Sequence, residues 1–269
     1  MKDLASHVRQ FCKEHGLIMN TDLGQHFLID QSVLDAILET ANVKEDDDVV
    51  EIGAGIGILT LELLKRTKNV TTIEIDPNVI PLLQEYLKEG ESPHLPTVVR
   101  GNALQASFPQ KPYKIVANIP YHITSPLLRH AFLESSRAPL SLTLLIQREV
   151  AEKIVDTKNA GLLTVIVGFF GTPRIVTKVP PKAFLPPPKV DSAVLHIDCF
   201  AEPKADAQTF DALLSLAKLS FGQKRKMLRN TFASLPGGLE MLDKAGIEGT
   251  RRPQTLSIDE WITLATLRV

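Results

Sequence analysis

Cysteine and long apolar runs are both scarce in this chain of 269 residues. The two cysteines, Cys12 and Cys199, lie far apart, and no metal-type ligand spacing surrounds them, so a disulfide framework and a zinc site are not expected. No stretch approaches the length of a membrane span. Residues 1–20 carry charges throughout, so we expect no signal peptide. These absences predict a cytoplasmic protein, with an organelle as the alternative if a targeting segment has been removed.

An excess of positive charge is also missing. The chain has 30 Lys and Arg against 31 Asp and Glu, a formal net charge of −1, so it is not a polycation. Any nucleic-acid-binding surface must therefore be local. With 44% hydrophobic residues, the composition is that of a globular protein with room for one large core and a small satellite domain.

Short β-branched segments alternate with segments of helical spacing in the first half of the chain. We expect strands at 49–52, 71–75, 97–99, 114–117 and 141–146, with helices at 59–65 and 79–87. This order predicts a parallel α/β sheet. Segments 174–179 and 193–197 are two further expected strands, and the proline-rich loop 180–188 between them should be stiff and lie outside the sheet.

Segment 161–170 is ambiguous from its residues alone. Its β-branched and aromatic composition favours a strand, while its all-round apolarity also permits a buried helix. Beyond a linker at 201–204, helical spacing returns at 210–228, at 239–245 and around Trp261. We therefore predict two domains, residues 1–203 and a small helical domain at 204–269.

A glycine loop follows the first expected strand, with Gly53, Gly55 and Gly57 in a G-x-G-x-G spacing. This differs from the G-x-G-x-x-G that sets a helix end on a pyrophosphate. It fits a nucleoside cofactor without phosphate, such as S-adenosylmethionine. Glu74 ends the second strand, where a carboxylate can accept from ribose hydroxyls. Asn102 follows the third strand and either faces the cofactor's adenine or forms a turn through its own side chain.

The run Asn118-Ile119-Pro120-Tyr121 ends the fourth strand, where open α/β sheets bind ligands. The Asn118 oxygen and the Ile119 carbonyl can accept both N–H bonds of an exocyclic amine, with Pro120 locking the geometry. Tyr121 and Phe184 would stack on the two faces of the base. For Phe184, packing of the proline-rich loop onto the core is the alternative. The pattern predicts methyl transfer to a nucleobase nitrogen without a strong base.

Positive charge gathers between Asp211 and Glu240, where no acidic residue intervenes. We expect these cations to contact RNA phosphates, with a solvated helix face as the alternative. The acidic run 45–48 lacks ligand-like spacing, so no metal site is expected. The predicted RNA-binding residues are Lys218, Lys224, Arg225, Lys226 and Arg229, which Arg251 and Arg252 would extend.

Six segments, taken in order, resemble one family: the ribosomal RNA adenine N6,N6-dimethyltransferases of the KsgA type, which act on the small subunit. The resemblance runs from about Leu4 to the C-terminus. The segments are 23–28 (LGQHFL), 51–57 (EIGAGIG), 74–76 (EID), 118–121 (NIPY), 184–192 (FLPPPKVDS) and 221–230 (FGQKRKMLRN).

The resemblance implies a class I S-adenosylmethionine-dependent methyltransferase fold. This is a Rossmann-like α/β fold with a seven-stranded sheet, its last strand antiparallel, and an all-helical C-terminal domain; segment 161–170 is then a helix. By similarity, Gln25 and the glycines hold the methionine part of the cofactor and Glu74 holds its ribose. His26, Leu28, Asn102 and Asn118 complete the expected cofactor site. The family usually has aspartate where this chain has Asn102, which puts the strength of binding there in question.

The resemblance also implies a substrate. Family members methylate two adjacent adenines in a hairpin near the 3′ end of small-subunit ribosomal RNA, and they act as checkpoints of subunit assembly. We expect the partner to be the immature small subunit, with no membrane association and the protein a monomer.

Three alternatives stay open at this point. The large-subunit adenine methyltransferase that confers macrolide resistance shares Asn-Ile-Pro-Tyr, but segments 184–192 and 221–230 favour the small-subunit enzyme. A non-catalytic RNA or DNA binder of the same fold is disfavoured by the intact glycine loop, Glu74 and Asn118. A nicotinamide-dependent dehydrogenase is disfavoured by the glycine spacing.

Overall fold

A computed structural model describes residues 3–20, 23–223 and 225–269. The chain divides into two compact units, the first formed by Met1–Ala151 with Arg174–Cys199 and the second by Glu152–Pro173 with Phe200–Val269. The break at Phe200 lies close to the expected boundary at residue 203. Segment Glu152–Pro173, however, groups with the C-terminal residues, although the sequence placed it in the first domain. The division into domains at residue 203 stays a prediction.

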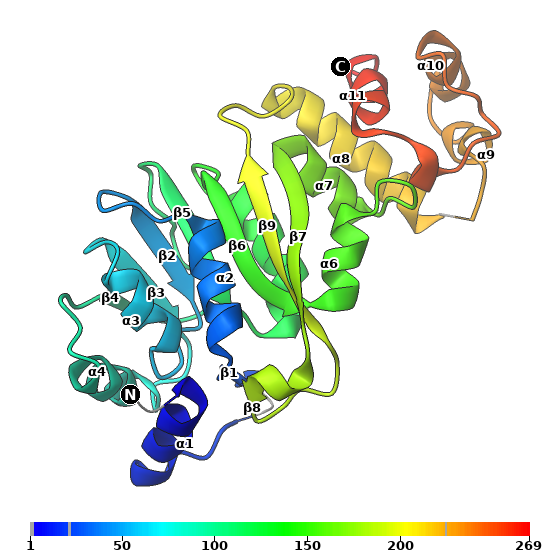
Figure 1. Ribbon diagram of the computed structural model, residues 1–269. Coiled ribbons are helices and arrows are strands. Elements are labelled where there is room, and N and C mark those ends of the chain that lie inside the picture. Colours follow the sequence, from blue (N-terminus) through cyan, green and yellow to red (C-terminus); the bar gives the residue numbers. More distant parts are fainter. Residues whose placement is uncertain (1–2, 21–22, 224) are drawn as a thin grey trace. The chain divides into compact units, whose positions relative to one another are not determined.

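A seven-stranded sheet dominates the first unit (Figure 1). Its order is β4-β3-β2-β5-β6-β9-β7. All described pairs from β4 to β6 are parallel, and β9, the last strand in sequence, pairs antiparallel with β6. The predicted α/β sheet with an antiparallel last strand is confirmed. The strands are β2 (Asp48–Ile52), β3 (Val70–Glu74), β4 (Thr97–Arg100), β5 (Tyr113–Asn118), β6 (Ser141–Gln147), β7 (Gly171–Val179) and β9 (Ser192–Cys199).

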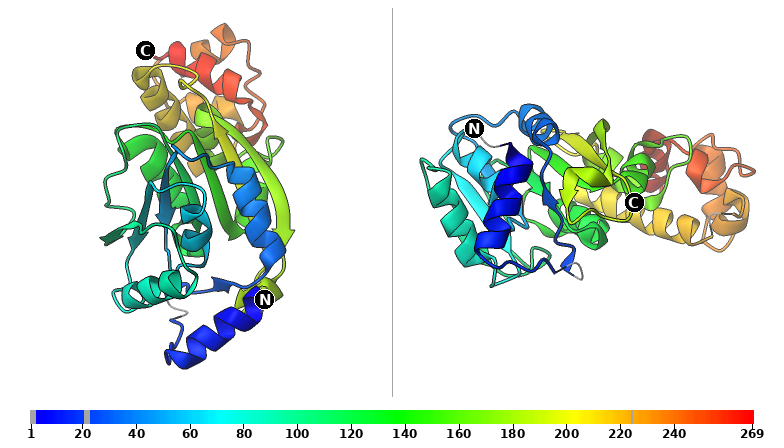
Figure 2. Two further views of the ribbon diagram at one scale, coloured as in Figure 1. Left: turned by 60° about the vertical axis from the view of Figure 1, so that its left-hand side comes forward. Right: turned by 60° about the horizontal axis from the view of Figure 1, so that its bottom comes forward.

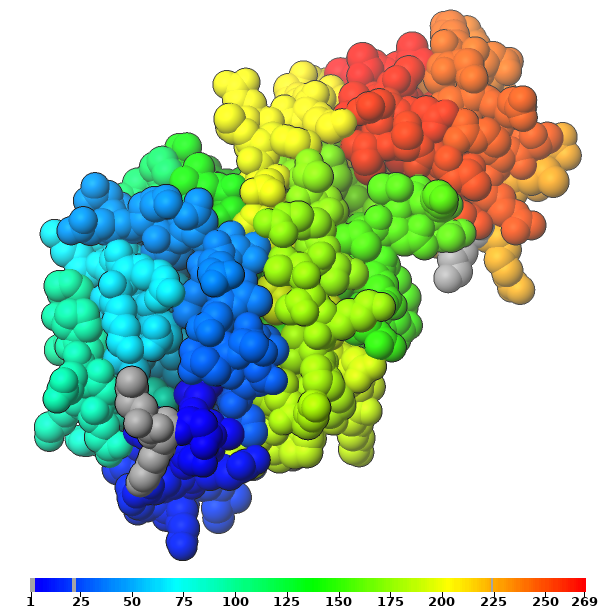
Figure 3. All heavy atoms as spheres, in the orientation of Figure 1, coloured from blue at the N-terminus to red at the C-terminus, as the bar shows by residue number. Residues whose placement is uncertain are grey.

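Helices precede these strands and connect them. They are α1 (Leu4–Glu14), α2 (Gln31–Ala41), α3 (Ile58–Leu64), α4 (Ile80–Glu89), α5 (Thr124–Arg129) and α6 (Arg148–Val155). Asp30 caps α2 by accepting from the backbone N–H groups of Ser32 and Val33. The apolar positions of α2, spaced three and four apart, are buried, and α2 packs over β5, β6 and β9. In the space-filling view its blue atoms cover this part of the sheet (Figure 3).

The N-terminal helix α1 packs against α4. The ring of Phe11 meets the ring of Tyr86 edge-on, with 5.1 Å between their centroids, and both side chains are buried. Figure 2 shows the two helices from two further directions. This contact joins α1 to α4, which in turn contacts α3, the helix after the glycine loop.

Strand β5 passes through the centre of the core. Ile115, Val116 and Ala117 are each 0% exposed, as expected for a parallel strand covered on both faces. The run ends abruptly at the polar Asn118. Because the apolar part of β5 is buried in the core, its last residue, Asn118, lies at the carboxyl edge of the sheet.

A small two-stranded sheet, which the sequence did not predict, lies outside the large one. It pairs β1 (Phe27–Leu28) antiparallel with β8 (Phe184–Leu185). A 3-10 turn, Pro181–Ala183, leads into β8. The proline-rich loop thus lies outside the seven-stranded sheet, as expected, and it is tied directly to segment 23–28.

The second unit is largely helical, with α7 (Leu162–Phe170), α8 (Ala207–Gly222), α9 (Leu228–Phe232), α10 (Gly238–Lys244) and α11 (Ile258–Thr266). Segment 161–170 is a helix, as the resemblance implies and against its β-like composition. Phe169 and Phe170 pack on Phe210 of α8, with centroids 4.6 and 5.1 Å apart. Burial on all sides explains why a helix carries this composition.

The prediction of a single helix over 210–228 is wrong. Helix α8 ends at Gly222, and Gln223 has φ −126° and ψ 39°, outside the helical region. A turn follows, in which the Lys226 N–H donates to the Gln223 carbonyl at 2.8 Å, and α9 starts at Leu228. Glycine is a poor helix former, so the helix ends where its propensity is lowest. Over the described part of the chain, no helix combines the length and apolarity that a bilayer crossing needs.

Candidate active site at the carboxyl edge of the sheet

A cavity opens where β2, β3, β4 and β5 end. Its wall includes the glycine loop, Glu51, Glu74, residues 101–103, Asn118 and Pro120, together with segment 23–28. Of the predicted cofactor residues, the structure brings Gln25, His26, Leu28, Gly53, Gly55, Glu74, Asn102 and Asn118 to this one wall. Gly57 does not line it, and is instead the N-cap residue of α3.

The glycine loop needs its glycines. Gly53 and Gly55 have φ values of +73° and +55°, which side-chain-bearing residues rarely adopt. A Cβ atom on Gly55 would also lie 2.9 Å from the ring of Phe27 on β1. The loop therefore folds back tightly, and its backbone forms the cavity wall without side chains in the way.

Glu74 is held from both sides. Its Oε2 accepts from the Gly55 N–H and its Oε1 from the Asp76 N–H, each at 2.9 Å. The residue is 6% exposed. A carboxylate has about four acceptor sites, so both oxygens keep capacity for further hydroxyl donors. The arrangement suits a ribose, and that role stays a prediction.

Gln25 links the chain just before it to the residues that follow β3. Its Nε2 donates to Asp76 Oδ2 at 2.7 Å, and its Oε1 accepts from the Asn20 N–H at 2.7 Å. Both ends of this side-chain amide are therefore used within the protein. Gln25 fixes the cavity rim, and its predicted contact with the methionine tail is untested.

Asn118 is oriented by segment 23–28. Its Nδ2 donates to the carbonyl of His26 at 3.0 Å. A carbonyl can only accept, so the amide nitrogen must face it, and Oδ1 is turned the other way. Within the described residues Oδ1 has no hydrogen-bond partner. Pro120 lies against Gly24, where an added Cβ would come within 2.8 Å of the proline Cβ.

The two rings expected to clamp a base lie in different environments. Tyr121 is partly exposed, shares a 2.6 Å hydrogen bond with Ser192, and lies nearly parallel to His26 at 6.2 Å between centroids. Burial raises the pKa of the Tyr121 phenol, while the bond to Ser192 opposes this. Phe184 is 2% exposed and belongs to the core. The packing alternative for Phe184 is thus what the structure shows, and its stacking role is untested.

Asn102 also takes the alternative that the sequence left open. Its Oδ1 accepts from the Leu104 N–H at 3.0 Å, so the side chain forms a turn of its own. The residue still lines the cavity and is exposed. Its oxygen accepts one hydrogen bond from the backbone and keeps a second lone pair, and its contact with the cofactor stays a prediction.

Glu51 is the cavity residue that sequence reasoning passed over. It is 1% exposed, and Thr60 Oγ1 donates to its Oε2 at 2.6 Å. Burial raises the pKa of the Glu51 carboxyl to about 7, against the opposing effect of Thr60. The available signal was its place as an acidic residue inside an apolar strand, directly before the glycine loop.

The charges of the cavity have one sign. Glu51 and Glu74 line it, and no Lys or Arg does so among residues whose placement is described. Such a wall suits a ligand of net positive charge and would repel the phosphates of a dinucleotide. S-adenosylmethionine, with its sulfonium, fits these residues. The glycine backbone, Glu74 and the 23–28 segment would hold it.

The predicted cations of the second unit lie on its surface. Four of them, which we call the basic surface, are exposed and form no ion pair with any described residue: Lys218, Arg225, Lys226 and Arg229. The fifth, Lys224, lies outside the described residues. The Arg229 N–H donates to the Gly249 carbonyl at 2.8 Å, which ties this segment to residues 249–251.

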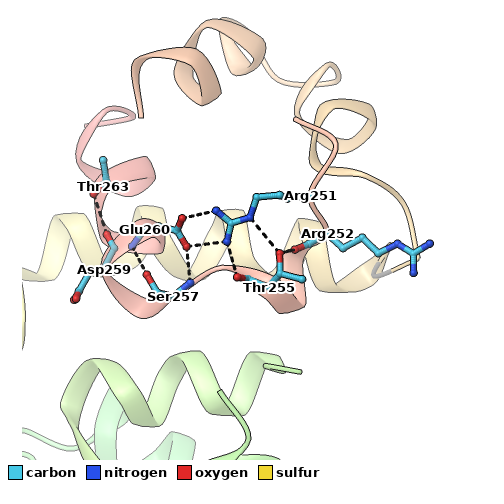
Figure 4. Close-up of polar contacts among 7 residues, drawn as sticks. All are labelled: Arg251, Arg252, Thr255, Ser257, Asp259, Glu260 and Thr263. Atoms are coloured by element: carbon cyan, nitrogen blue, oxygen red, sulfur yellow. Dashed lines mark hydrogen bonds and ion pairs between the residues drawn. The ribbon is translucent and has the colours of Figure 1, made fainter. Parts of the chain in front are cut away.

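Arg251 and Arg252 are adjacent but differ in what they contact (Figure 4). Arg251 donates to both carboxylate oxygens of Glu260 and to the Thr255 carbonyl. Its charge is therefore neutralised within the second unit, where these bonds stabilise the start of α11. Arg252 is exposed, and its side chain extends away from this network. Only Arg252 is placed to extend the basic surface.

The comparisons with known proteins agree with one another. The sequence model of the family Ribosomal RNA adenine dimethylase matches residues 16–268. Ribosomal RNA small subunit methyltransferase A of Clostridium botulinum (strain Kyoto / Type A2) is 39% identical over 267 residues, covering 95% of this chain and 96% of the relative. The protein of the same name from Dehalococcoides mccartyi is 40% identical over 270 residues, covering 96% and 91%.

Two solved structures are similar over most of the chain. A dimethyladenosine transferase from Plasmodium falciparum has a TM-score of 0.79 at 28% identity, covering 89% of this chain and 96% of that one. The 23S rRNA methyltransferase ErmE has a TM-score of 0.74 at 30% identity, covering 89% and 98%. The match of the family model over nearly the whole chain decides the identity: this chain belongs to the ribosomal RNA adenine dimethylase family.

Proposed function

We propose that this protein transfers methyl groups from S-adenosylmethionine to N6 of two adjacent adenines in a hairpin near the 3′ end of small-subunit ribosomal RNA. The product is N6,N6-dimethyladenosine. Membership of the adenine dimethylase family and the small-subunit enzymes among its relatives support this. The protein acts as a cytoplasmic monomer on the immature small subunit, as a step of its biogenesis.

The observation that carries the proposal is the orientation of Asn118. Because its Nδ2 is held by the His26 carbonyl at 3.0 Å, its Oδ1 is the acceptor left for a substrate. The Ile119 carbonyl follows directly and supplies a second acceptor. Together they accept both N–H bonds of an adenine amine, which draws the nitrogen toward a tetrahedral shape and aims its lone pair.

Bound S-adenosylmethionine supplies a methyl group made electrophilic by the neighbouring sulfonium. The chain's own part is to orient the amine. An amide and a backbone carbonyl are not bases, so this site works by alignment and by stabilising the positive charge that develops on N6. Tyr121 offers a ring for stacking at the rim. Phe184 can add the second ring only if its side chain leaves the core.

The basic surface of the second unit binds RNA in this proposal. These exposed cations have no carboxylate partner among the described residues, so they can contact phosphates, which position RNA without reading its sequence. Recognition of the particular hairpin then depends on its shape and on extrusion of the target base.

The test is incubation of the full chain with labelled S-adenosylmethionine and unmethylated small or large ribosomal subunits, followed by nucleoside analysis. We expect label in N6,N6-dimethyladenosine from the small subunit alone. Label confined to the large subunit would instead favour the activity of ErmE, to which the chain is 30% identical. No label in either subunit, with cofactor binding intact, would contradict a catalytic role.

A further inference from the structure

The side chain of Glu51 has no part in the transfer described above, although it lines the same cavity. It belongs to β2, an inner strand of the seven-stranded sheet, and is 1% exposed. Thr60 Oγ1 donates to its Oε2 at 2.6 Å, and the Thr72 hydroxyl, like that of Thr60, favours the ionised form. Among the described residues it forms no ion pair. A buried carboxylate that lacks a cation is disfavoured in its ionised form.

The groups around Glu51 do not supply that cation. From β3 the titratable neighbour is Glu74, whose negative charge opposes ionisation of Glu51. From α3 comes the neutral Thr60, and α2 contributes Ile37 to the cavity wall. The end of β5 contributes the uncharged Asn118. The remaining titratable wall residues are His26 and His122, and Asp76, bonded to Gln25, lies beside Glu74.

We propose that a proton and the positive charge of S-adenosylmethionine compete for Glu51. In the free protein at acid pH the carboxyl carries a proton. When the cofactor binds, Glu51 releases that proton to the buffer, and the resulting carboxylate balances the charge of the cofactor. The balance is one proton released for one net positive charge bound, with no covalent change. The proposal depends on the proposed function only for the identity of the cofactor.

The high pKa of the Glu51 carboxyl, about 7, places this exchange within the physiological range. Below that value, each unit of falling pH should weaken cofactor binding by about tenfold, because one proton must leave for each cofactor bound. Above it, the affinity should level off. Neither behaviour is expected if Glu51 only fills space in the core.

The test is calorimetric titration of the full chain with S-adenosylmethionine in buffers of different ionisation enthalpy. From about pH 5.5 to 6.5 the cofactor's α-amino group stays protonated, since such groups titrate at about pH 8, and the Glu51→Gln variant corrects for its contribution at neutral pH. We expect release of about one proton at the acid end, declining through neutral pH. Glu51→Gln should release none at the acid end. Glu39→Gln, the same change at an exposed position of α2 outside the cavity wall, should behave as the wild type.

A second variant keeps the carboxyl in place. Thr60→Val removes the hydroxyl that favours the ionised form, so the midpoint of proton release should move to higher pH. This variant also serves if Glu51→Gln does not fold. A wild type that releases no proton, a Glu51→Gln variant that releases as many as the wild type, or an unmoved midpoint in Thr60→Val would each overturn the proposal. Absence of any binding heat would count against the cofactor, and so against the proposed function.

Discussion

The cavity of the first unit is lined by buried acidic residues, whereas the basic surface of the second unit consists of exposed cations. In the cavity, Glu51 and Glu74 are 1% and 6% exposed, and fixed donors hold their oxygens. On the basic surface, Arg225, Lys226 and Arg229 are exposed and without carboxylate partners in the described residues. Buried charges select a small ligand by geometry, whereas exposed charges bind a polyanion by their number and by counterion release.

This contrast predicts where mutations have their largest effects. A change in the cavity alters fixed hydrogen bonds and buried area, so its effect should be large and specific. A change on the basic surface should alter affinity in small steps that depend on salt. Four predictions test this contrast, in order of decreasing expected effect.

The largest effect is expected for Phe184→Ala. Because the ring is 2% exposed within the core, its loss should lower the free energy of unfolding by about 3–5 kcal/mol. Phe184→Leu keeps most of the apolar volume and should cost below about 1.5 kcal/mol. Denaturant unfolding of both variants measures this, and methyl transfer by Phe184→Leu should stay close to wild type.

The opposite result would revise this assignment of Phe184. If Phe184→Leu unfolds like the wild type but loses tenfold or more in turnover, the ring must leave the core and stack on the base. Stacking on a base is worth about 1–3 kcal/mol, enough for such a loss. The predicted clamp with Tyr121 would then be supported.

Asn118→Ala should reduce methyl transfer about 100- to 1000-fold, the usual effect of removing one fixed polar group from a reacting centre. RNA affinity should be unchanged, because the side chain faces the cavity. Single-turnover methylation and filter binding separate the two effects. Asn69→Ala, at the amino-terminal end of β3, is the matched control. Near-normal turnover by Asn118→Ala would contradict the proposed role.

The place of this site in the fold could be predicted from the sequence because short motifs mark it. The glycine loop, Glu74 and Asn118 follow successive strands, and the carboxyl ends of parallel strands meet at one edge. Local sequence could not decide how side chains use their hydrogen bonds. Asn102 and Phe184 each had two open interpretations; the structure shows the turn at Asn102 and the burial of Phe184, and their contacts with ligands stay predictions.

Glu51 should make the stability of the cofactor-free protein depend on pH. The pKa of its carboxyl is raised from 4.5 to about 7 by burial, so the folded state keeps a proton that the unfolded chain has lost. This stabilisation is present below about pH 4.5 and is lost as the pH rises to about 7, a difference of about 3 kcal/mol. Unfolding at several pH values, with Glu51→Gln as comparison, measures it. Parallel profiles for the two proteins would contradict the assignment.

The helical unit was harder to predict than the sheet. Periodicity of apolar residues continues from α8 into α9, so it cannot show that the chain turns at Gly222 and Gln223. The composition of α7 likewise favoured a strand, since a helix buried on all sides loses its amphipathic pattern. Only the family resemblance predicted its helical state.

The smallest effects concern the two neighbouring arginines. Arg251→Gln removes the pairing with Glu260 and should lower the free energy of unfolding by about 1–2 kcal/mol, because the pair is only partly exposed. Arg252→Gln should leave stability unchanged but reduce the slope of log affinity against log salt by about 1, the loss of one phosphate contact. RNA titrations at several salt concentrations measure that slope.

Lys244→Gln is the matched control for these titrations. Its ammonium already pairs with Glu240 at 2.9 Å on an exposed turn of α10, so the salt slope should not change. Equal slopes for Arg252→Gln and the wild type would exclude Arg252 from the RNA contact. An altered slope for Arg251→Gln at temperatures where it is fully folded would show that the pairing with Glu260 opens on RNA binding, and the contrast between fixed and free charge would then fail within this unit.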